Sequence, residues 1–400
     1  MIRGITPSTS SDTLQTLAHA LGEALVSFRE RDLLRTLSTV EEIRGAEVRL
    51  NGRWLVCWCA NDYLGLSTHP QVIQAACGAA TRWGVGARAS RLLAGSTHLH
   101  AQLEARLAEF FHAEAAVVFS SGYLANVGTL SALLTSEDVV LVDRLAHASL
   151  IDACRASRAR LRVFRHNDAE HVAGLLKRST TARRRVVVTE GVFSMDGDSA
   201  PMKPLLDVVR AHDALLYLDD AHGAFVVGRT GKGSPEAAGV SHAELIYMGT
   251  LGKALGSQGG FIVGPRTLTE FLHNRARQLI YATALAVPVT AAALEALRLV
   301  EQEPTLRARL ARNVHRLHAR LKDLACLRGA APSHIVPVVV GASRRARELS
   351  DALRHRGMWA PAIRPPTVPE GTARLRLSLS ALHTTNQIDQ LADALHELLA

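Results

Sequence analysis

The chain has 400 residues, 48% of them hydrophobic and 21% charged, which is typical of a globular protein with a large core. It contains no run of about 18 uncharged apolar residues and no N-terminal signal pattern, so we expect a cytoplasmic protein that does not span a membrane. The net charge of +9 would suit nucleic acid, but the arginines are scattered, aromatic residues make up only 4%, and no nucleic-acid-binding motif is present. We therefore expect no nucleic-acid partner; an acidic small molecule or carrier protein fits the charge as well.

The first 60 residues are expected to form an N-terminal segment that is helical and then extended. Leucines recur at helical spacing over residues 14–25. Residues 48–59 have the pattern of a hairpin around Asn51-Gly52, a good signal for a two-residue turn.

Residues 61–287 are expected to form a large domain in which short apolar strands alternate with amphipathic helices. The candidate strands are 115–119, 139–142, 161–164, 186–189, 215–218, 245–248 and 260–263. Helices are expected between most of them, for example at 123–134, 169–176 and 204–212. Continuous apolar strands separated by helices predict a mostly parallel sheet that is covered on both faces, and therefore the α/β class.

Residues 288–400 have a different pattern, which predicts a smaller α+β domain. The expected elements are helices at 289–300 and 306–324, a strand at 335–340, a helix at 345–356, a strand at 375–379 and a final helix. The texture changes near Pro288, which we take as the boundary between the two domains.

The five cysteines stand at scattered positions, Cys57, Cys59, Cys77, Cys154 and Cys326. An odd number without regular spacing is not a disulfide framework. Cys57 and Cys59 form a C-x-C, but no second Cys or His pair lies nearby to complete a zinc site. We predict reduced thiols and no metal site.

Two glycine-containing segments resemble nucleotide-binding motifs, but neither has the required context. The segment 84–89 follows a predicted helix rather than a strand, which argues against a dinucleotide site. Gly252-Lys253 lacks both the Ser/Thr and the first glycine of a P-loop.

Two predicted strands instead lead into polar residues that suit pyridoxal 5′-phosphate (PLP). One runs directly into Asp219, Asp220 and His222, and the other is followed by Thr250 and Lys253. Ligand sites of open α/β sheets lie at the carboxyl ends of strands. An aspartate at the pyridinium nitrogen, an imine-forming lysine of lowered pKa and a histidine at the ring oxygen are what PLP chemistry requires.

A third strand end offers a site for the phosphate. Ser121 and Gly122 form a small-residue turn before a predicted helix that starts at Tyr123. Backbone N–H groups at a helix N-terminus bind phosphate. Such a turn is more often only a helix cap. It therefore indicates a phosphate site only in combination with the two strand ends at Asp219 and Lys253.

Together these segments resemble the α-oxoamine synthases, a branch of the PLP-dependent transferases of fold type I, over about residues 27–399. The matching segments are Asn61–Leu66, Gly84–Gly95, Ser121–Tyr123, Asp143–Ser149, Thr189–Gly197, Asp219–Gly223 and Thr250–Lys253. The resemblance implies a large mostly parallel-sheet domain that binds PLP, a smaller C-terminal domain, and active sites between the subunits of a homodimer.

The resemblance also implies roles for single residues. Lys253 would form the internal aldimine and move the proton at the substrate α-carbon. Asp219 would pair with the pyridinium nitrogen, His147 would stack on the ring and contact substrate, and His222 would bond the ring oxygen or the substrate. These four are the expected catalytic residues. Further cofactor contacts are implied for Ser121, Gly122, Tyr123, Ser194, Thr250 and, across the dimer, Thr283.

The same resemblance implies the substrate contacts. Arg376, with Asn61, would hold the amino-acid carboxylate, while Arg35 and Thr367 would contact the acyl substrate. Taken alone, Arg376 on an alternating strand could be a solvated edge charge. In a site that must hold a carboxylate in a fixed position, binding of that carboxylate by the fork-shaped guanidinium is the better interpretation of Arg376.

Within the family, the segment 362–369 with 374–377 resembles the branch that condenses L-alanine with a pimeloyl thioester and releases CO2. The sequence leaves open whether the thioester is pimeloyl-CoA or a pimeloyl-acyl-carrier protein. One alternative is another α-oxoamine synthase that uses glycine or serine with a different acyl group. A second is a non-catalytic regulatory protein of the same fold, against which the intact Lys253, Asp219, His147 and His222 argue.

Overall fold

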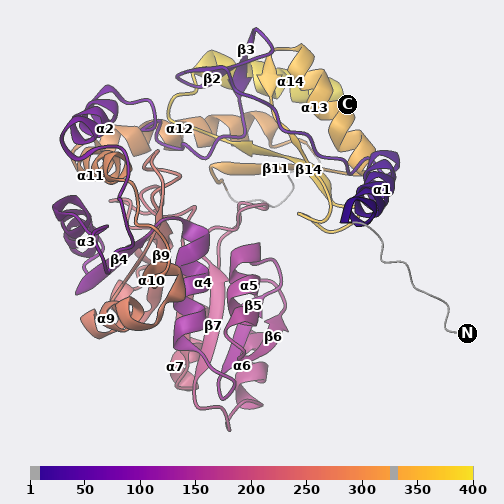
Figure 1. Ribbon diagram of the computed structural model, residues 1–400. Helices are drawn as coiled ribbons and strands as arrows, with labels where there is room; N and C mark the ends of the chain where they lie inside the picture. Colours follow the sequence, from indigo (N-terminus) through magenta and orange to yellow (C-terminus); the bar gives the residue numbers. More distant parts are fainter. Residues whose placement is uncertain (1–9, 325–331, 400) are drawn as a thin grey trace, which may run out of the picture.

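The computed structural model describes residues 10–324 and 332–399, and its centre is a seven-stranded sheet (Figure 1). In spatial order its strands are β4 (Ala115–Phe119), β10 (Gly260–Gly264), β9 (Ile246–Thr250), β8 (Leu215–Asp219), β7 (Arg185–Glu190), β5 (Val139–Asp143) and β6 (Arg160–Phe164). Only β10 runs antiparallel to its neighbours. The mostly parallel sheet is therefore confirmed, with every predicted strand within two residues of its observed bounds.

Helices cover both faces of this sheet, because its central strands are apolar on both sides. In β5, Val139 and Leu141 pack into one core and Val140 and Val142 into the other. The first core contains α3 (His98–Phe110), α6 (Ala169–Lys177) and α7 (Met202–Ala211). The second contains α4 (Gly122–Leu133), α5 (Ala148–Ala156), α9 (Arg266–Arg275) and α10 (Arg277–Ile280). Buried alternation of this kind holds the carboxyl ends of the parallel strands along one rigid edge.

The C-terminal part forms a second, smaller layer of sheet and helices. Its three-stranded sheet has the order β11 (Ile335–Gly341), β14 (Ala373–Ser378), β13 (Ala362–Ile363). The helices of this part are α11 (Val287–Gln302), α12 (Pro304–Leu321), α13 (Ser343–His355) and α14 (Thr385–Leu399). All the predicted elements of this part are present, with helix ends shifted by up to three residues. Strand β14 matters for function, because it carries Arg376.

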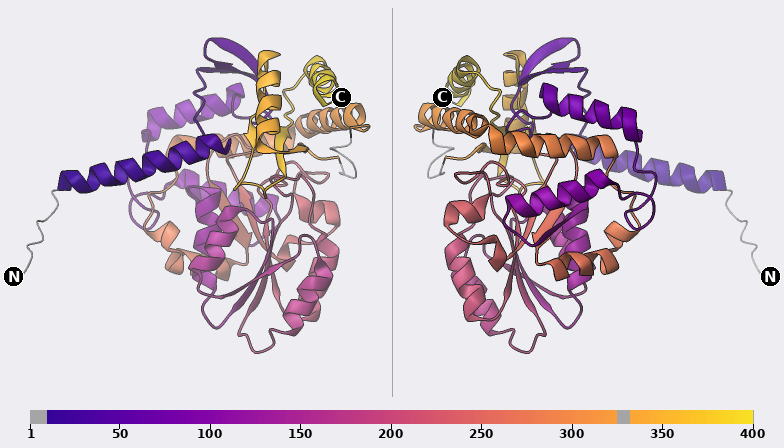
Figure 2. Two further views of the ribbon diagram at one scale, coloured as in Figure 1. Left: turned by 90° about the vertical axis from the view of Figure 1, so that its right-hand side faces the viewer. Right: turned by 90° about the vertical axis from the view of Figure 1, so that its left-hand side faces the viewer.

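The N-terminal segment joins the C-terminal part. Helix α1 (Ser10–Glu30) extends away from the rest of the chain (Figure 2). Strands β1 (Glu42–Arg44), β2 (Glu47–Leu50) and β3 (Arg53–Cys57) then share a sheet with β12 (Met358–Trp359), which runs parallel to β3. The hairpin is confirmed, whereas β1, β12 and β13, of two or three residues each, are too short to leave a pattern in the sequence. The proposed domain bounds at residues 60 and 287 stay predictions.

Two sequence predictions concern cysteines and membranes. Among the cysteines that the structure describes, Cys57, Cys59, Cys77 and Cys154 are free thiols, while Cys326 lies outside the described residues. Within residues 10–324 and 332–399, none of the helices is both long and apolar enough to cross a bilayer.

The remaining elements complete the connections between these parts. They are α2 (Pro70–Trp83), α8 (Ser234–Ala238) and a 3-10 turn at His242–Glu244. Helix α2 packs on α11. The predicted helix before Gly84 is α2, which confirms that no strand precedes the glycine-rich segment.

Candidate active site

Lys253 lies in the turn after β9, and its amine contacts a buried histidine. The distance from Lys253 Nζ to His222 Nε2 is 2.7 Å, and His222 Nδ1 lies 2.6 Å from the Tyr63 hydroxyl. Burial lowers the pKa of Lys253 to about 8, although the carboxylates of Asp219 and Glu190 act in the opposite direction. Burial also lowers the pKa of His222 well below its usual range, and the positive charge of Lys253 adds to this effect. Lys253 is thus an amine that becomes nucleophilic near neutral pH.

Asp219 ends β8 on the same edge of the sheet, in a pocket of hydrogen-bond donors. Asn126 of α4 donates to Asp219 Oδ2 at 2.7 Å, and the backbone N–H of Ala221 donates to Oδ1 at 3.0 Å. The Asn126 carboxamide is itself held, since it donates to Ser149 Oγ at 2.9 Å and accepts from the Tyr217 hydroxyl at 2.8 Å. Such fixed donors hold the buried Asp219 carboxylate in place.

His147 sits at the N-terminus of α5 as an exposed ring. Its Nδ1 lies 2.7 Å from Ser149 Oγ, and its backbone N–H donates to Glu190 Oε1 at 2.6 Å. Burial, together with the nearby Asp219 carboxylate, raises the pKa of Glu190 to about 8. Glu190 and Asp219 are cross-strand partners of β7 and β8, so His147 is anchored to the strand ends that hold Asp219.

The N-terminus of α4 faces Thr250 at the end of β9. Ser121 caps the helix by accepting from Leu124 N at 3.1 Å. A Cβ at Gly122 would lie 3.1 Å from the Met248 side chain and 3.6 Å from Thr250 Oγ1, so only a residue without a side chain leaves this cradle open. The Tyr123 side chain points elsewhere and donates to Asp152 at 2.6 Å, which leaves its backbone N–H for an anion.

Arg376 and Asn61, here called the carboxylate clamp, are brought together from β14 and from the segment after β3. Arg376 is only 7% exposed, which excludes the solvated edge charge considered above. Its Nη1 donates to Asn61 Oδ1 at 3.2 Å and to Ser378 Oγ at 2.8 Å, and its Nη2 donates to the Tyr63 hydroxyl at 3.3 Å. Its Nε donates to the carbonyl of Ser194, which ties that predicted site residue to the clamp.

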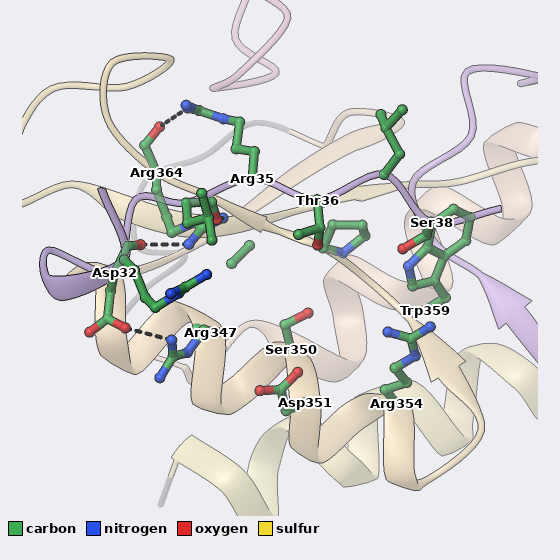
Figure 3. Close-up of a pocket in the computed structure, with 15 residues that line it drawn as sticks. Asp32, Arg35, Thr36, Ser38, Arg347, Ser350, Asp351, Arg354, Trp359 and Arg364 are labelled. Carbon is green, nitrogen blue, oxygen red and sulfur yellow. Dashed lines mark hydrogen bonds and ion pairs between the residues drawn. The ribbon is translucent and has the colours of Figure 1, made fainter. Parts of the chain in front are cut away.

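Arg35 and Thr367 meet each other, but no hydrogen bond joins them to Lys253 within residues 10–324 and 332–399. Arg35 Nη2 donates to Thr367 Oγ1 at 3.3 Å and to the Pro365 carbonyl at 3.0 Å. Arg35 also lines a cavity of about 630 Å³ beside α13 (Figure 3). Arg364 lies across from Arg35 in this view and donates to the carbonyls of Asp32 and Leu34.

Thr283 also stands apart from Lys253. It is exposed and forms an isolated bridge with Ser90 of the glycine-rich segment. In the described part of this single chain, no hydrogen bond connects Thr283 with the cradle at Gly122. A role at the phosphate of a partner subunit therefore stays a prediction.

Several contributors were not assigned a role from the sequence. Tyr63 and Glu190 lay inside the quoted motifs, and their places after a strand or at its end were available as signals. Ser149 also lay inside a quoted motif, whereas Asn126 gave no signal, because a polar residue one turn into a helix is ordinary. The contact of Asn126 with Asp219 depends on how α4 packs on the sheet, and Ser149 of α5 is linked to Asp219 through Asn126.

The family model described as "Aminotransferase class I and II" matches residues 54–395. A curated relative from Anaeromyxobacter dehalogenans, named 8-amino-7-oxononanoate synthase, is 47% identical over 379 residues, covering 95% of each chain. A solved structure named 8-amino-7-oxononanoate synthase from Francisella tularensis aligns with a TM-score of 0.74 at 28% identity, over 86% of this chain and 96% of that one.

A second solved structure is a serine palmitoyltransferase from S. paucimobilis with a bound PLP–myriocin aldimine. It aligns with a TM-score of 0.89 at 30% identity and covers 95% of this chain and 97% of that one. The sequence similarity to one enzyme and the shape similarity to another therefore lie within the same group, the α-oxoamine synthases, as the motifs indicated.

Proposed function

This chain belongs to the class I and II aminotransferase family, and from that premise we propose that it is a PLP-dependent acyltransferase that condenses L-alanine with a pimeloyl thioester. The products are 8-amino-7-oxononanoate, CO2 and the free thiol carrier, which is a step of biotin biosynthesis. The observation that carries the proposal is the meeting of Lys253, Asp219 and the carboxylate clamp at one edge of the sheet.

The residues present fit PLP. Bound there, PLP supplies an aldehyde for an amine and a protonated ring that accepts electron density from the substrate α-carbon. Asp219 would hold the ring nitrogen protonated, and His222 would face the ring oxygen. The α4 N-terminus with Thr250 would take the phosphate, and the open ring of His147 would lie on one face.

The amino-acid substrate would be oriented by the clamp. Arg376 offers charge-assisted hydrogen bonds to a carboxylate, which places the α-carbon where Lys253 can remove and later return its proton. Burial lowers the pKa of Lys253 to about 8, so a substantial fraction of the amine is uncharged near neutral pH and can act as a base. The reaction takes up one proton overall, because the thiolate of the leaving carrier is protonated.

We extend the proposal to the acyl donor. Arg35 and Thr367 would contact the pimeloyl chain, and the net charge of +9 would attract an acidic carrier or CoA. The association rate with a carrier-protein thioester is then expected to fall as salt rises from low to physiological strength. A rate that stays flat over this range would contradict the electrostatic part.

We also propose a homodimer in the cytoplasm. Around the glycine-rich segment the single chain exposes apolar side chains, among them Val85 (80%), Leu93 (78%) and Tyr281 (71%), beside the exposed Thr283. Contiguous exposed apolar residues commonly mark protein interfaces. The free thiols suit a reducing compartment. Sedimentation of the active protein as a monomer would contradict the dimer.

The assignment of the lysine is tested by Lys253→Ala, with Lys203→Ala on α7 as the matched control. Lys253→Ala should lose both product and the visible absorbance of bound PLP, and Lys203→Ala should keep both. Visible absorbance that survives in Lys253→Ala would mean that another lysine holds the cofactor.

Two alternatives give different results in the same assays. Another α-oxoamine synthase would bind PLP but form product only with glycine or serine. A non-catalytic protein would bind PLP through Lys253 and form no product with any thioester. The 47% identity to a curated 8-amino-7-oxononanoate synthase favours the alanine reaction over both.

A further inference from the structure

Tyr63 lies between the carboxylate clamp and Lys253. It is fully buried, and its hydroxyl is 2.6 Å from His222 Nδ1, 3.1 Å from Asn61 Oδ1 and 3.3 Å from Arg376 Nη2. The second ring nitrogen of His222, Nε2, lies 2.7 Å from Lys253 Nζ. A continuous path of polar contacts therefore runs from the clamp to the lysine.

A count of protons shows that this path has two arrangements. A tyrosine hydroxyl has one proton to donate, and Arg376 can only donate to it. The hydroxyl proton therefore goes either to His222 Nδ1 or to Asn61 Oδ1. In the first case His222 carries its own proton on Nε2 and presents a donor toward Lys253. In the second case His222 donates from Nδ1 to Tyr63 and presents an acceptor.

A substrate carboxylate would favour the second arrangement. It would compete for the two longest contacts of Arg376, those to Asn61 at 3.2 Å and to Tyr63 at 3.3 Å. Once Asn61 Oδ1 loses the guanidinium donor, the Tyr63 hydroxyl is the donor that remains to it among the described residues. Unpaired buried acceptors are costly, so the hydroxyl turns toward Asn61.

We propose that Tyr63 is a positioning residue that couples occupancy of the carboxylate clamp to the tautomer of His222, that is, to which ring nitrogen carries the proton, beside Lys253. The inference rests on the proposed function and adds to it. An amino acid that presents a carboxylate would thus change the hydrogen bonding at the cofactor ring oxygen and the lysine before any bond is made. A side chain that served only to fill space would not produce this effect.

The hydroxyl can be removed without removing the packing. The Tyr63 ring lies edge-on to His334 at 4.4 Å between centroids, and a phenylalanine keeps this contact. Tyr247 provides the matched control, since it is also fully buried and its hydroxyl donates to Asp220 at 3.0 Å, away from the clamp. We therefore compare Tyr63→Phe with Tyr247→Phe.

The experiment uses the PLP-loaded protein and propionate, which has the carboxylate of alanine but no amine to react. The pH midpoint of the visible absorbance of bound PLP is measured with and without saturating propionate. In the wild type, loss of the His222 donor and the added negative charge should both raise the midpoint, together by about one pH unit. In Tyr63→Phe only the direct charge effect remains, so the rise should be half of that or less. Tyr247→Phe should match the wild type.

The coupling is wrong if Tyr63→Phe keeps the full rise, or if propionate does not move the wild-type midpoint. If Tyr63→Phe does not fold, Asn61→Ala makes the same test, because it leaves His222 as the acceptor of the Tyr63 proton. A full rise in Asn61→Ala at saturating propionate would then overturn the coupling. A wild-type chain without visible PLP absorbance would contradict the proposed function itself, which separates the two failures.

Discussion

The carboxylate clamp makes a quantitative prediction for Arg376→Lys. A guanidinium has five N–H donors. Four of those in Arg376 point at protein acceptors: the Ser194 carbonyl, Ser378 Oγ, Asn61 Oδ1 and the Tyr63 hydroxyl. The fifth, on Nη2, has no hydrogen-bond acceptor in the described part of the protein, and the contacts to Asn61 and Tyr63 are the two longest.

An alanine carboxylate can therefore gain one to two charge-assisted hydrogen bonds from Arg376. Each contributes about 1.5–3 kcal/mol. A lysine at this position keeps the positive charge but loses the fork, so we expect Arg376→Lys to lose about one such bond. That corresponds to an alanine affinity that is about tenfold to hundredfold weaker, while the affinity for the acyl thioester stays within about threefold.

Alanine binding is followed at the visible absorbance of PLP, so that it is separated from turnover. Arg374→Lys is the control, because Arg374 is buried two residues away on β14 but pairs with Asp196. It should weaken alanine binding less than threefold. The reasoning is refuted if Arg376→Lys binds alanine like the wild type, or if both variants weaken it equally.

Three further outcomes follow from the structure. Burial lowers the pKa of Lys253 from 10.5 to about 8. Since the neutral amine is the nucleophile, the rate of PLP uptake by the apoprotein should rise with pH and reach half of its maximum near pH 8. A midpoint near pH 10 would contradict the lowered pKa of Lys253. Gly256 has φ +62°, and a Cβ there would lie 2.1 Å from a backbone nitrogen. Urea unfolding should therefore show that Gly256→Ala lowers the free energy of unfolding by about 2–4 kcal/mol. The control is Gly252→Ala, whose Cβ would meet nothing closer than 3.6 Å and which should change this free energy by less than about 1 kcal/mol. Asn126→Ala removes a donor to Asp219 at 2.7 Å and should weaken PLP binding about tenfold or more by fluorescence titration; unchanged binding would argue against Asp219 as the ring partner.

The sequence was sufficient for the large sheet because its strands are continuous apolar runs with helices between them. Strand ends and polar residues coincide in such folds, and this is why Asp219 and Lys253 could be placed at one edge before the structure was known. The shortest strands could not be predicted from the sequence. Strands β12 and β13 have two residues each, and their pairing depends on the approach of distant segments.

The contacts around the site were less accessible to sequence reasoning. Asn126 meets Asp219 only because α4 packs on the large sheet beside β9 and β10, and Tyr63 meets Arg376 across more than 300 residues of chain. Neither pairing has a local pattern. For Thr283 the sequence makes a prediction that a single chain cannot test, because the expected contact is with another subunit.

The central claim is tested most directly by a competition for product. The purified protein is incubated with PLP, equal amounts of L-alanine, glycine and L-serine, and a mixture of pimeloyl, succinyl, acetyl and palmitoyl thioesters, and the products are identified by mass spectrometry. The account predicts 8-amino-7-oxononanoate alone, from alanine and the pimeloyl thioester. A condensation product from glycine or serine, or from another acyl group, would contradict it.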